Sequence, residues 1–362
     1  MIPIFWPSAP KYRLELLWAL AKQLKTRWYG QGSKVDEFER AFGAKFGYEF
    51  CTSVNSGSAA LELAYKLAGI KKGDKVIVPV FTCTATNIPL VRMGAKLIFA
   101  DINKMTWTPE YADIVSKISG AKAIVTVNLG GIECNENIYR IAKELNIPVI
   151  VDACQSLGVS EPHGDFVCYS FQAIKHFTTG DGGILVTRNS EHHARAKRLR
   201  WFGIDREAKK NNDWHPYKNR EMIMDFEEPG YKFHMNDIAA VFGLIGLKHS
   251  DELLNHRRMI ARIYDSEIQN CHKVRGGSFW LYGLEVENRD EFARKLKEAG
   301  IETNIVQMRN DIFKVFGGKR RRLPNMNYSE DRIIYIPIHN AMSLKDAKKV
   351  ACEVNKALCG SQ

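Results

Sequence analysis

The segment from residue 149 to residue 187 brings one lysine and one carboxylate into an apolar setting. The run from Ile147 to Val151 is typical of a buried parallel strand and ends at Asp152. A second short strand is predicted from Phe166 to Ser170, and Lys175 follows it between apolar neighbours. A lysine in such company is costly to keep charged, so its pKa falls and it becomes a nucleophile or forms a Schiff base. A lysine that binds an aldehyde and a carboxylate that pairs with a pyridinium nitrogen are what a protein supplies to pyridoxal 5′-phosphate (PLP).

The preceding part of the chain indicates an α/β fold. Strands are predicted from Lys75 to Val80, from Leu97 to Asp101 and from Ala123 to Asn128, with helical patterns between them. Such alternation predicts a mainly parallel sheet with helices on both faces. Ligands of these sheets bind at the carboxyl ends of the strands, which here carry Asp101, Asn128, Asp152 and Ser170. Asn128 is either structural or a ligand contact, and the sequence leaves both interpretations open.

A candidate phosphate site opens a helix that is predicted to run to about Leu67. The sequence Asn-Ser-Gly-Ser at 55–58 begins this helix, and the free N–H groups of a helix N-terminus attract anions. Gly57 allows an anion to approach the backbone, and the Ser58 hydroxyl adds a donor. Alone the pattern indicates only an N-cap, but its place ahead of the alternating strands and helices favours a phosphate site.

These separated motifs resemble one known family. The DegT/DnrJ/EryC1/StrS sugar aminotransferases, which are PLP enzymes of fold type I, carry a pattern like (E/V)DAAQ…SF…K…TTGEGG. Here the pattern stands as VDACQ at 151–155, YSF at 169–171, Lys175 and TTGDGG at 178–183. The motifs occur in the right order, and the resemblance extends over nearly the whole chain. It implies a mainly parallel seven-stranded sheet flanked by helices, with a smaller α+β C-terminal domain.

The predicted division places a large PLP-binding domain at 1–250 and a small domain at 251–362. A long helix from about Asp251 to Ile268 leads into the small domain, and a strand is predicted to begin near Phe279. Its closing helix is predicted from Leu344 to Leu358, where Ser343 ahead of Asp346 indicates an N-terminal capping arrangement.

The resemblance implies a role for each motif residue. Lys175 would hold the PLP aldehyde and later move a proton, and Asp152 would keep the ring nitrogen protonated. Gln155 would bond the ring oxygen or lie against the ring. The phosphate would be held by Gly57, Ser58 and Ser170.

Cys83 departs from the family pattern. Most relatives have an aromatic residue there, stacked on the pyridine ring. Either the Cys83 thiol covers the ring, or Phe81 or another side chain does. The hydroxyls of Thr82, Thr84 and Thr86 are interpreted as turn and helix-start groups.

The resemblance also implies a homodimer with shared sites. In the family the turn at 230–236 reaches the partner's site, which makes Lys232 and His234 candidates for the partner's PLP phosphate. The helix from Ile238 to Leu247 is apolar nearly all round, so it is buried either in a dimer or in its own subunit. Residues 206–228 lack periodicity and are interpreted as an active-site flap or a dimer arm.

Two further segments lie near the substrate in the family. Tyr29, Gly30 and Gly32 are weak candidates for this role, and the alternative is an ordinary loop. Arg309 and the basic run 319–322 would meet substrate phosphates, or they form a solvated loop. The formal net charge is +11, and a solvated basic loop is the preferred explanation for the excess. Steering of anionic substrates is the second explanation. Nucleic-acid binding is the third, because no motif for it is present.

Other classes find little support in the sequence. No apolar run approaches the roughly 20 residues of a membrane span, and no signal peptide, metal motif or hydrolase motif is recognised. The eight cysteines contain no C-x-x-C pair and are expected to be reduced thiols, which favours the cytoplasm.

The activity implied by the family is transfer of an amino group to a keto-sugar. L-glutamate is the expected donor, the sugar is usually nucleotide-linked, and the product would serve amino-sugar biosynthesis such as that of lipopolysaccharide O-antigen. The alternatives are an aminotransferase of another keto substrate, a sugar dehydratase and a non-catalytic regulator. Lys175 argues against the dehydratases, which carry histidine there, and a regulator would tend to lose Lys175 or Asp152. The nucleotide, the aminated carbon and its stereochemistry stay open.

Overall fold

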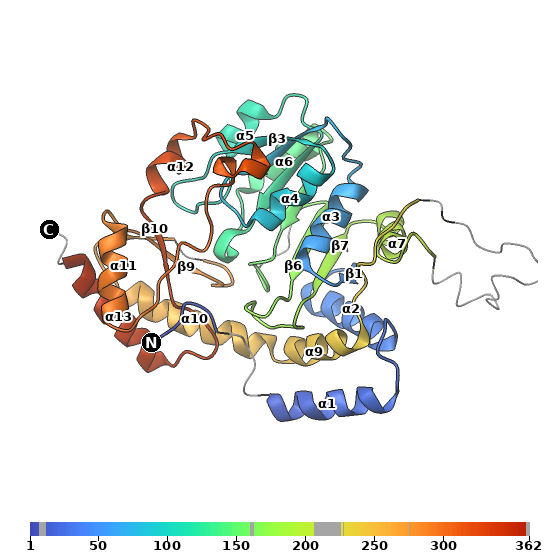
Figure 1. Cartoon of the computed structure of the whole chain (residues 1–362), viewed down its shortest axis with the longest axis horizontal. Coiled ribbons are helices and arrows are strands. Elements are labelled where there is room, and N and C mark those ends of the chain that lie inside the picture. The colour runs from blue at the N-terminus through green and yellow to red at the C-terminus, as the bar shows by residue number, and fades with distance from the viewer. Residues whose placement is uncertain (7–11, 160–162, 206–225, 227, 275, 360–362) are drawn as a thin grey trace, which may run out of the picture.

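The computed structural model describes residues 1–6, 12–159, 163–205, 226, 228–274 and 276–359 (Figure 1). Most of the segment 206–228, predicted to be a flap or arm, lies outside the described residues. Within the described part of the chain, no helix is long and apolar enough to cross a membrane.

A seven-stranded sheet forms the centre of the molecule. Its strands are β1 (Phe50–Val54), β2 (Lys75–Pro79), β3 (Lys96–Ala100), β4 (Ala123–Val127), β5 (Val149–Asp152), β6 (Phe166–Ser170) and β7 (Gly183–Thr187). They lie in the order β1-β7-β6-β5-β4-β2-β3. The neighbours from β6 to β3 are parallel, whereas β7 is antiparallel to both β1 and β6. The predicted mainly parallel sheet is therefore confirmed.

Helices cover both faces of this sheet. One face packs on α3 (Gly57–Leu67), α4 (Thr84–Arg92) and α7 (Ser190–Leu199). The other packs on α2 (Ser33–Phe46), α5 (Tyr111–Lys117), α6 (Glu136–Glu144) and α9 (Asp237–Lys248). Successive side chains of a strand alternate between the two cores, as Ile150 and Val151 of β5 do. Burial on both faces explains why the strands read as continuous apolar runs.

A smaller antiparallel sheet lies beside the first (Figure 1). It consists of β8 (His272–Val274), β9 (Tyr282–Glu285) and β10 (Ile333–Ile336) in the order β10-β9-β8. The helices α10 (Ser250–Glu267), α11 (Arg289–Glu298) and α13 (Leu344–Cys359) share its apolar core. The short helix α12 (Pro324–Ser329) precedes β10. This arrangement has the predicted α+β character, and the boundary at residue 250 stays a prediction.

Two apolar segments begin ahead of the strands that they contain. Strand β5 begins at Val149 because the Ile147 N–H donates to Ala142 O (2.8 Å) at the end of α6 and Pro148 has no N–H to give. Strand β9 begins at Tyr282, since Phe279 has a φ of 50° and the Trp280 N–H donates to Gly130 O (3.1 Å). The edge strand β1 was not identified from the sequence.

Candidate active site

The predicted lysine and carboxylate lie at the carboxyl end of the parallel strands. Asp152 is the last residue of β5 and Ser170 the last of β6, and the loop after β6 carries Lys175. Lys175 exposes 9% of its surface and Asp152 exposes 4%. This edge is where ligands of such sheets bind.

Lys175 is held in a dry setting with few polar neighbours. Its Nζ lies 3.8 Å from the centroid of the Trp280 ring. Burial lowers the pKa of Lys175, and the nearby Cys154, Asp152 and Cys83 only partly oppose this effect. The amine is therefore more readily deprotonated than an exposed lysine, as a nucleophile requires.

Two donors orient the Asp152 carboxylate. Oδ2 accepts a hydrogen bond from Thr86 Oγ1 (2.7 Å), and Oδ1 accepts one from the Cys154 N–H (3.1 Å). Thr82 Oγ1 lies 2.8 Å from Thr86 Oγ1, and since Thr86 donates to Asp152, Thr82 donates to Thr86. The sequence analysis missed this role of the threonines. The threonines follow β2 at the same edge of the sheet as Asp152, and this position in the sequence could have indicated the contact.

The backbone at the start of α3 closely approaches β6. A Cβ added at Gly57 would lie 2.8 Å from Ser170 Cβ and 2.9 Å from Cys154 Sγ, so only glycine fits there. Ser56 is the N-cap and accepts from the Ala59 N–H (3.1 Å), while Ser58 is exposed at the helix N-terminus. The first N–H groups of a helix have no intrahelical partner. Gly57 and Ser58 at the start of α3 and Ser170 at the end of β6 would form a phosphate cradle, and this role stays a prediction.

Gln155 and Cys83 are the remaining residues predicted to contact the cofactor ring. Gln155 Oε1 accepts from the Gly130 N–H (2.7 Å), which leaves its Nε2 as the end that could donate to a ligand. Cys83, just ahead of α4, is exposed. Phe81 is buried and packs edge-on against Trp107, with the two ring centroids 6.4 Å apart. Of the two side chains considered for covering a ring, Cys83 is the one exposed near Lys175.

Known proteins match most of the length of this chain. The model of the DegT/DnrJ/EryC1/StrS aminotransferase family matches residues 11–355. The chain belongs to this family.

Several relatives carry out named reactions. The UDP-4-amino-4,6-dideoxy-N-acetyl-beta-L-altrosamine transaminase of Campylobacter jejuni is 32% identical, and the match covers 94% of this chain and 96% of that protein. The GDP-perosamine synthase of Escherichia coli O157:H7 is 29% identical over 92% and 96% of the two chains. The crystal structure of the sugar aminotransferase CalS13 from Micromonospora echinospora has a TM-score of 0.89 and 29% identity, with 98% and 100% coverage.

Members of the DegT/DnrJ/EryC1/StrS family depend on PLP, and this chain is a PLP-dependent sugar aminotransferase. Its residues fit the cofactor. The absence of a side chain at Gly57 lets the start of α3 approach Ser170 closely, the buried Lys175 can bind an aldehyde, and Asp152 offers a carboxylate at the same edge.

The turn at 230–236, predicted to reach a partner's site, also makes contacts within its own chain. Lys232 Nζ lies 4.1 Å from the centroid of the Trp201 ring, and the His234 ring centroid is 3.9 Å from that of Trp201. The Asn55 N–H donates to Phe233 O (2.6 Å), which fixes the turn beside the start of α3. A phosphate contact of Lys232 and His234 stays a prediction.

Two candidate substrate contacts near the N-terminus, Gly30 and Gly32, bond the start of α9, and their contact with substrate stays a prediction. The Gly32 N–H donates to Asp237 Oδ1 (2.8 Å), and Gly30 O accepts from the Asp237 N–H (2.9 Å) at the start of α9. Tyr29 is half exposed. Asn128 is buried, and its Nδ2 donates to Ser156 Oγ (3.2 Å), which is a structural contact.

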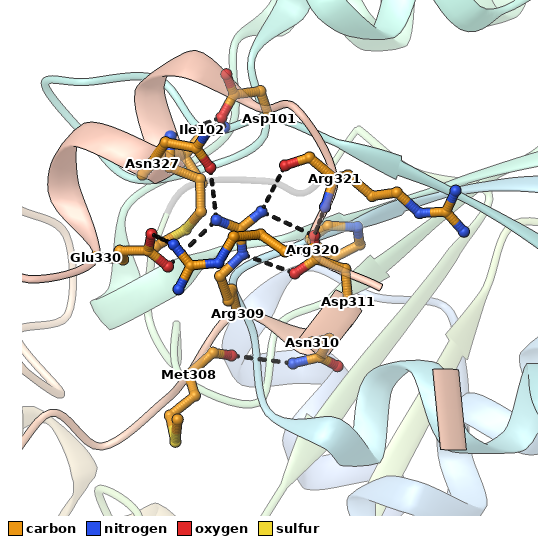
Figure 2. A network of polar contacts seen from close by, with 12 residues as sticks. Asp101, Ile102, Met308, Arg309, Asn310, Asp311, Arg320, Arg321, Asn327 and Glu330 are labelled. Carbon is orange, nitrogen blue, oxygen red and sulfur yellow. Dashed lines mark hydrogen bonds and ion pairs between the residues drawn. The ribbon is translucent and has the colours of Figure 1, made fainter. Parts of the chain in front are cut away.

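Arg309 lies in a buried network, so neither interpretation from the sequence describes it. Figure 2 shows its guanidinium in the centre of this network. The guanidinium makes two bonds to the Asp311 carboxylate (2.7 and 2.8 Å) and others to Asn327 Oδ1 (2.6 Å), Glu330 Oε2 (3.2 Å) and Arg321 O (3.0 Å). Arg309 exposes 2% of its surface. Its role is to anchor the loop, whereas residues 319–322 are exposed.

Asn310 links this network to the site. Its Nδ2 donates to Thr82 O (2.8 Å), its Oδ1 accepts from Asn87 Nδ2 (2.9 Å), and its N–H donates to Val80 O (2.6 Å). The segment therefore holds the turn whose Thr82 hydroxyl bonds Thr86, the donor to Asp152.

Proposed function

We propose that this enzyme transfers an amino group from L-glutamate to the keto carbon of a nucleotide-linked sugar, as a cytoplasmic homodimer in amino-sugar biosynthesis such as that of O-antigen. The observation that carries the proposal is the buried Lys175 beside Asp152 at the carboxyl end of the parallel strands. The relatives named above act on sugars linked to UDP or GDP, according to their names, which favours a nucleotide-linked substrate.

Each proposed site residue has a separate role. When bound, PLP supplies a ring that withdraws electrons from the substrate carbon. Lys175 would hold the cofactor through Nζ and, once released, carry a proton at the same atom. Asp152 would pair with the ring nitrogen, and the donors Thr86 and Cys154 N–H keep its carboxylate oriented. The cradle of Gly57, Ser58 and Ser170 would bind the phosphate.

The proposed homodimer is supported by an apolar surface on helix α1 (Arg13–Lys25). This helix packs on α9 and lies at the margin of the molecule (Figure 1). Leu14, Leu17 and Trp18 expose 83%, 62% and 63% of their surfaces. Apolar side chains gathered on one surface mark interaction sites, and a second copy of the chain would cover them.

An assay with defined substrates tests the proposal. The protein loaded with PLP is incubated with L-glutamate and a panel of nucleotide-linked keto-sugars, and formation of 2-oxoglutarate and amino-sugar is measured. At least one sugar should be aminated, while keto acids other than 2-oxoglutarate, the product of the glutamate half-reaction, should not be. Amination of keto acids alone would identify the runner-up, an aminotransferase of another keto substrate.

The matched control is Lys175→Ala. This variant should lose all turnover and the adduct that borohydride fixes on the native protein, because no other amine replaces Nζ. Turnover at the native rate in Lys175→Ala would contradict the assignment of Lys175.

A further inference from the structure

The indole ring of Trp280 lies directly against the amine of Lys175. Nζ is 3.8 Å from the ring centroid, and Trp280 exposes only 3% of its surface. An ammonium group over an aromatic face is attracted by the negative charge of the π system, and shielding from water strengthens this attraction. The ring therefore offers a binding face to the amine whenever the amine is charged and unattached.

Trp280 is fixed by contacts that do not involve the lysine side chain. Its Nε1 donates to Ile174 O (3.1 Å), and its backbone N–H donates to Gly130 O (3.1 Å). The ring stacks on Phe5 with centroids 5.5 Å apart. The position of the face is thus set in advance, and the flexible lysine side chain is the part that moves.

Arg257 of α10 holds the backbone on which Trp280 stands. Its Nη1 donates to Phe279 O (3.2 Å), Trp280 O (3.3 Å) and Ile338 O (2.8 Å). Phe279 has a φ of 50°, a conformation that costs free energy for any residue other than glycine and persists where the surroundings fix it. The side chain of Arg257 is fully buried, so this anchor is rigid.

The other titratable groups around Lys175 come from different elements. Burial lowers its pKa, whereas Cys154, Asp152 and Cys83 raise it and Arg257 lowers it further. No ion pair of Lys175 with a carboxylate occurs in the described part of the chain. An aromatic face attracts the ammonium more weakly than a bonded carboxylate does, which lets the amine leave the face again.

We infer that Trp280 is a positioning residue that holds the released amine of Lys175 during the half of the cycle in which the amine is not attached to the cofactor. The amine then stays at one place beside the site, ready to carry its proton and to reattach. This inference rests on the proposed role of Lys175.

Two substitutions separate the aromatic face from the hydrogen bond. Trp280→Phe and Trp280→Leu both lose the indole N–H, and only Trp280→Phe keeps a ring. Each protein is loaded with pyridoxamine 5′-phosphate, which leaves Lys175 unattached. Its free lysine amines are then acetylated with a small amount of reagent, so that only a small fraction of each amine reacts. Mass mapping then gives the labelling rate of Lys175, with Lys22 over the exposed ring of Trp18 (3.3 Å) as the internal reference.

Lys175 should be labelled slowly in the native protein and in Trp280→Phe, and several-fold faster in Trp280→Leu. Single-turnover amination should fall by about tenfold in Trp280→Leu and much less in Trp280→Phe. Equal labelling in all three proteins, or equal effects of the two substitutions, would overturn the inference.

A second measurement leaves Trp280 unchanged, in case Trp280→Leu does not fold. The near-ultraviolet spectrum of the pyridoxamine-loaded native protein is compared with that of Lys175→Met. A charge over an indole shifts its absorption, so a difference band typical of tryptophan is expected, and its absence would overturn the inference. Borohydride fixation of PLP on native Lys175 tests the proposed function separately, whatever the Trp280 variants do.

Discussion

Asp152 shows how much of a residue's role depends on its immediate neighbours. A carboxylate at a strand end is common, and here the Thr86 hydroxyl and the Cys154 N–H each bond one of its oxygens. The remaining lone pairs of a carboxylate so oriented can still accept a bond from a pyridinium nitrogen. The two hydrogen bonds thus fix the orientation of the Asp152 carboxylate.

We expect Asp152→Asn to lower kcat by about one to two orders of magnitude. A charge-assisted bond in a dry site is worth roughly 1.5–3 kcal/mol, and the substitution removes the charge while nearly keeping the shape. Single-turnover kinetics with saturating cofactor measure the effect.

The matched control is Asp101→Asn at the carboxyl end of the edge strand β3, which is separated from β5 by β4 and β2. Asp101 is also buried, but it accepts from the backbone of Asn325 and Met326, away from Lys175. This variant should lose stability and keep its kcat. Equal kinetics in Asp152→Asn and the native protein would refute the role of Asp152.

At the scale of elements, the loop from Arg309 to Arg321 is fixed by buried ionic contacts. The carboxylate of Asp311 is fully buried and bonds both the Arg309 guanidinium and the Arg321 N–H (2.6 Å) (Figure 2). Through Asn310 this loop supports the turn after β2. An element of the C-terminal part of the chain thereby stabilises the edge that carries the site.

Arg309→Met should destabilise the protein by about 3–5 kcal/mol, because it leaves the buried Asp311 without its partner. Urea unfolding measures this loss. Arg322→Ala is the control, since Arg322 is exposed on the same loop and should change stability by no more than about 0.5 kcal/mol. Equal stability of the two variants would show that the buried ion pair contributes little.

At the scale of the whole molecule, helix α9 is buried only in part by its own subunit. It packs on α1 and α2, and Ala240, Gly243 and Leu247 are buried. Ile238, Leu244 and Ile245 are only partly buried. Together with the exposed apolar residues of α1, these side chains offer a surface that a second copy of the chain would cover.

Complementation tests whether the sites are shared between subunits. A Lys175→Ala chain is mixed with a chain that carries Lys232→Ala and His234→Ala. In a mixed dimer with shared sites, one site contains both defects and the other contains neither, so activity should return to a substantial fraction of the native value.

The control for complementation is each inactive variant alone, together with proof of subunit exchange by mass. If exchange is complete and no activity returns, Lys232 and His234 belong to the site of their own subunit.

Features that depend on a few neighbouring residues could be predicted from the sequence. The alternation of strands and helices, the strand ends at Asp152 and Ser170, and the start of α3 all follow from local patterns. The capping arrangement at Ser343 is confirmed, because Ser343 N–H bonds Asp346 Oδ2 (3.1 Å) and Asp346 N–H bonds Ser343 Oγ (3.1 Å). Such contacts span three residues, so the order of residues fixes them.

The distant residues that complete the site could not be predicted from the sequence, because folding brings them together. Asn310 bonds a carbonyl 228 positions away, and Trp280 bonds one 106 positions away, so no local pattern indicates either contact. The guanidinium of Arg309 could bind an anionic substrate, yet in the folded chain it pairs with the carboxylates of Asp311 and Glu330. A side chain's type determines which bonds it can make, and the folded arrangement of distant segments determines which partners are within reach.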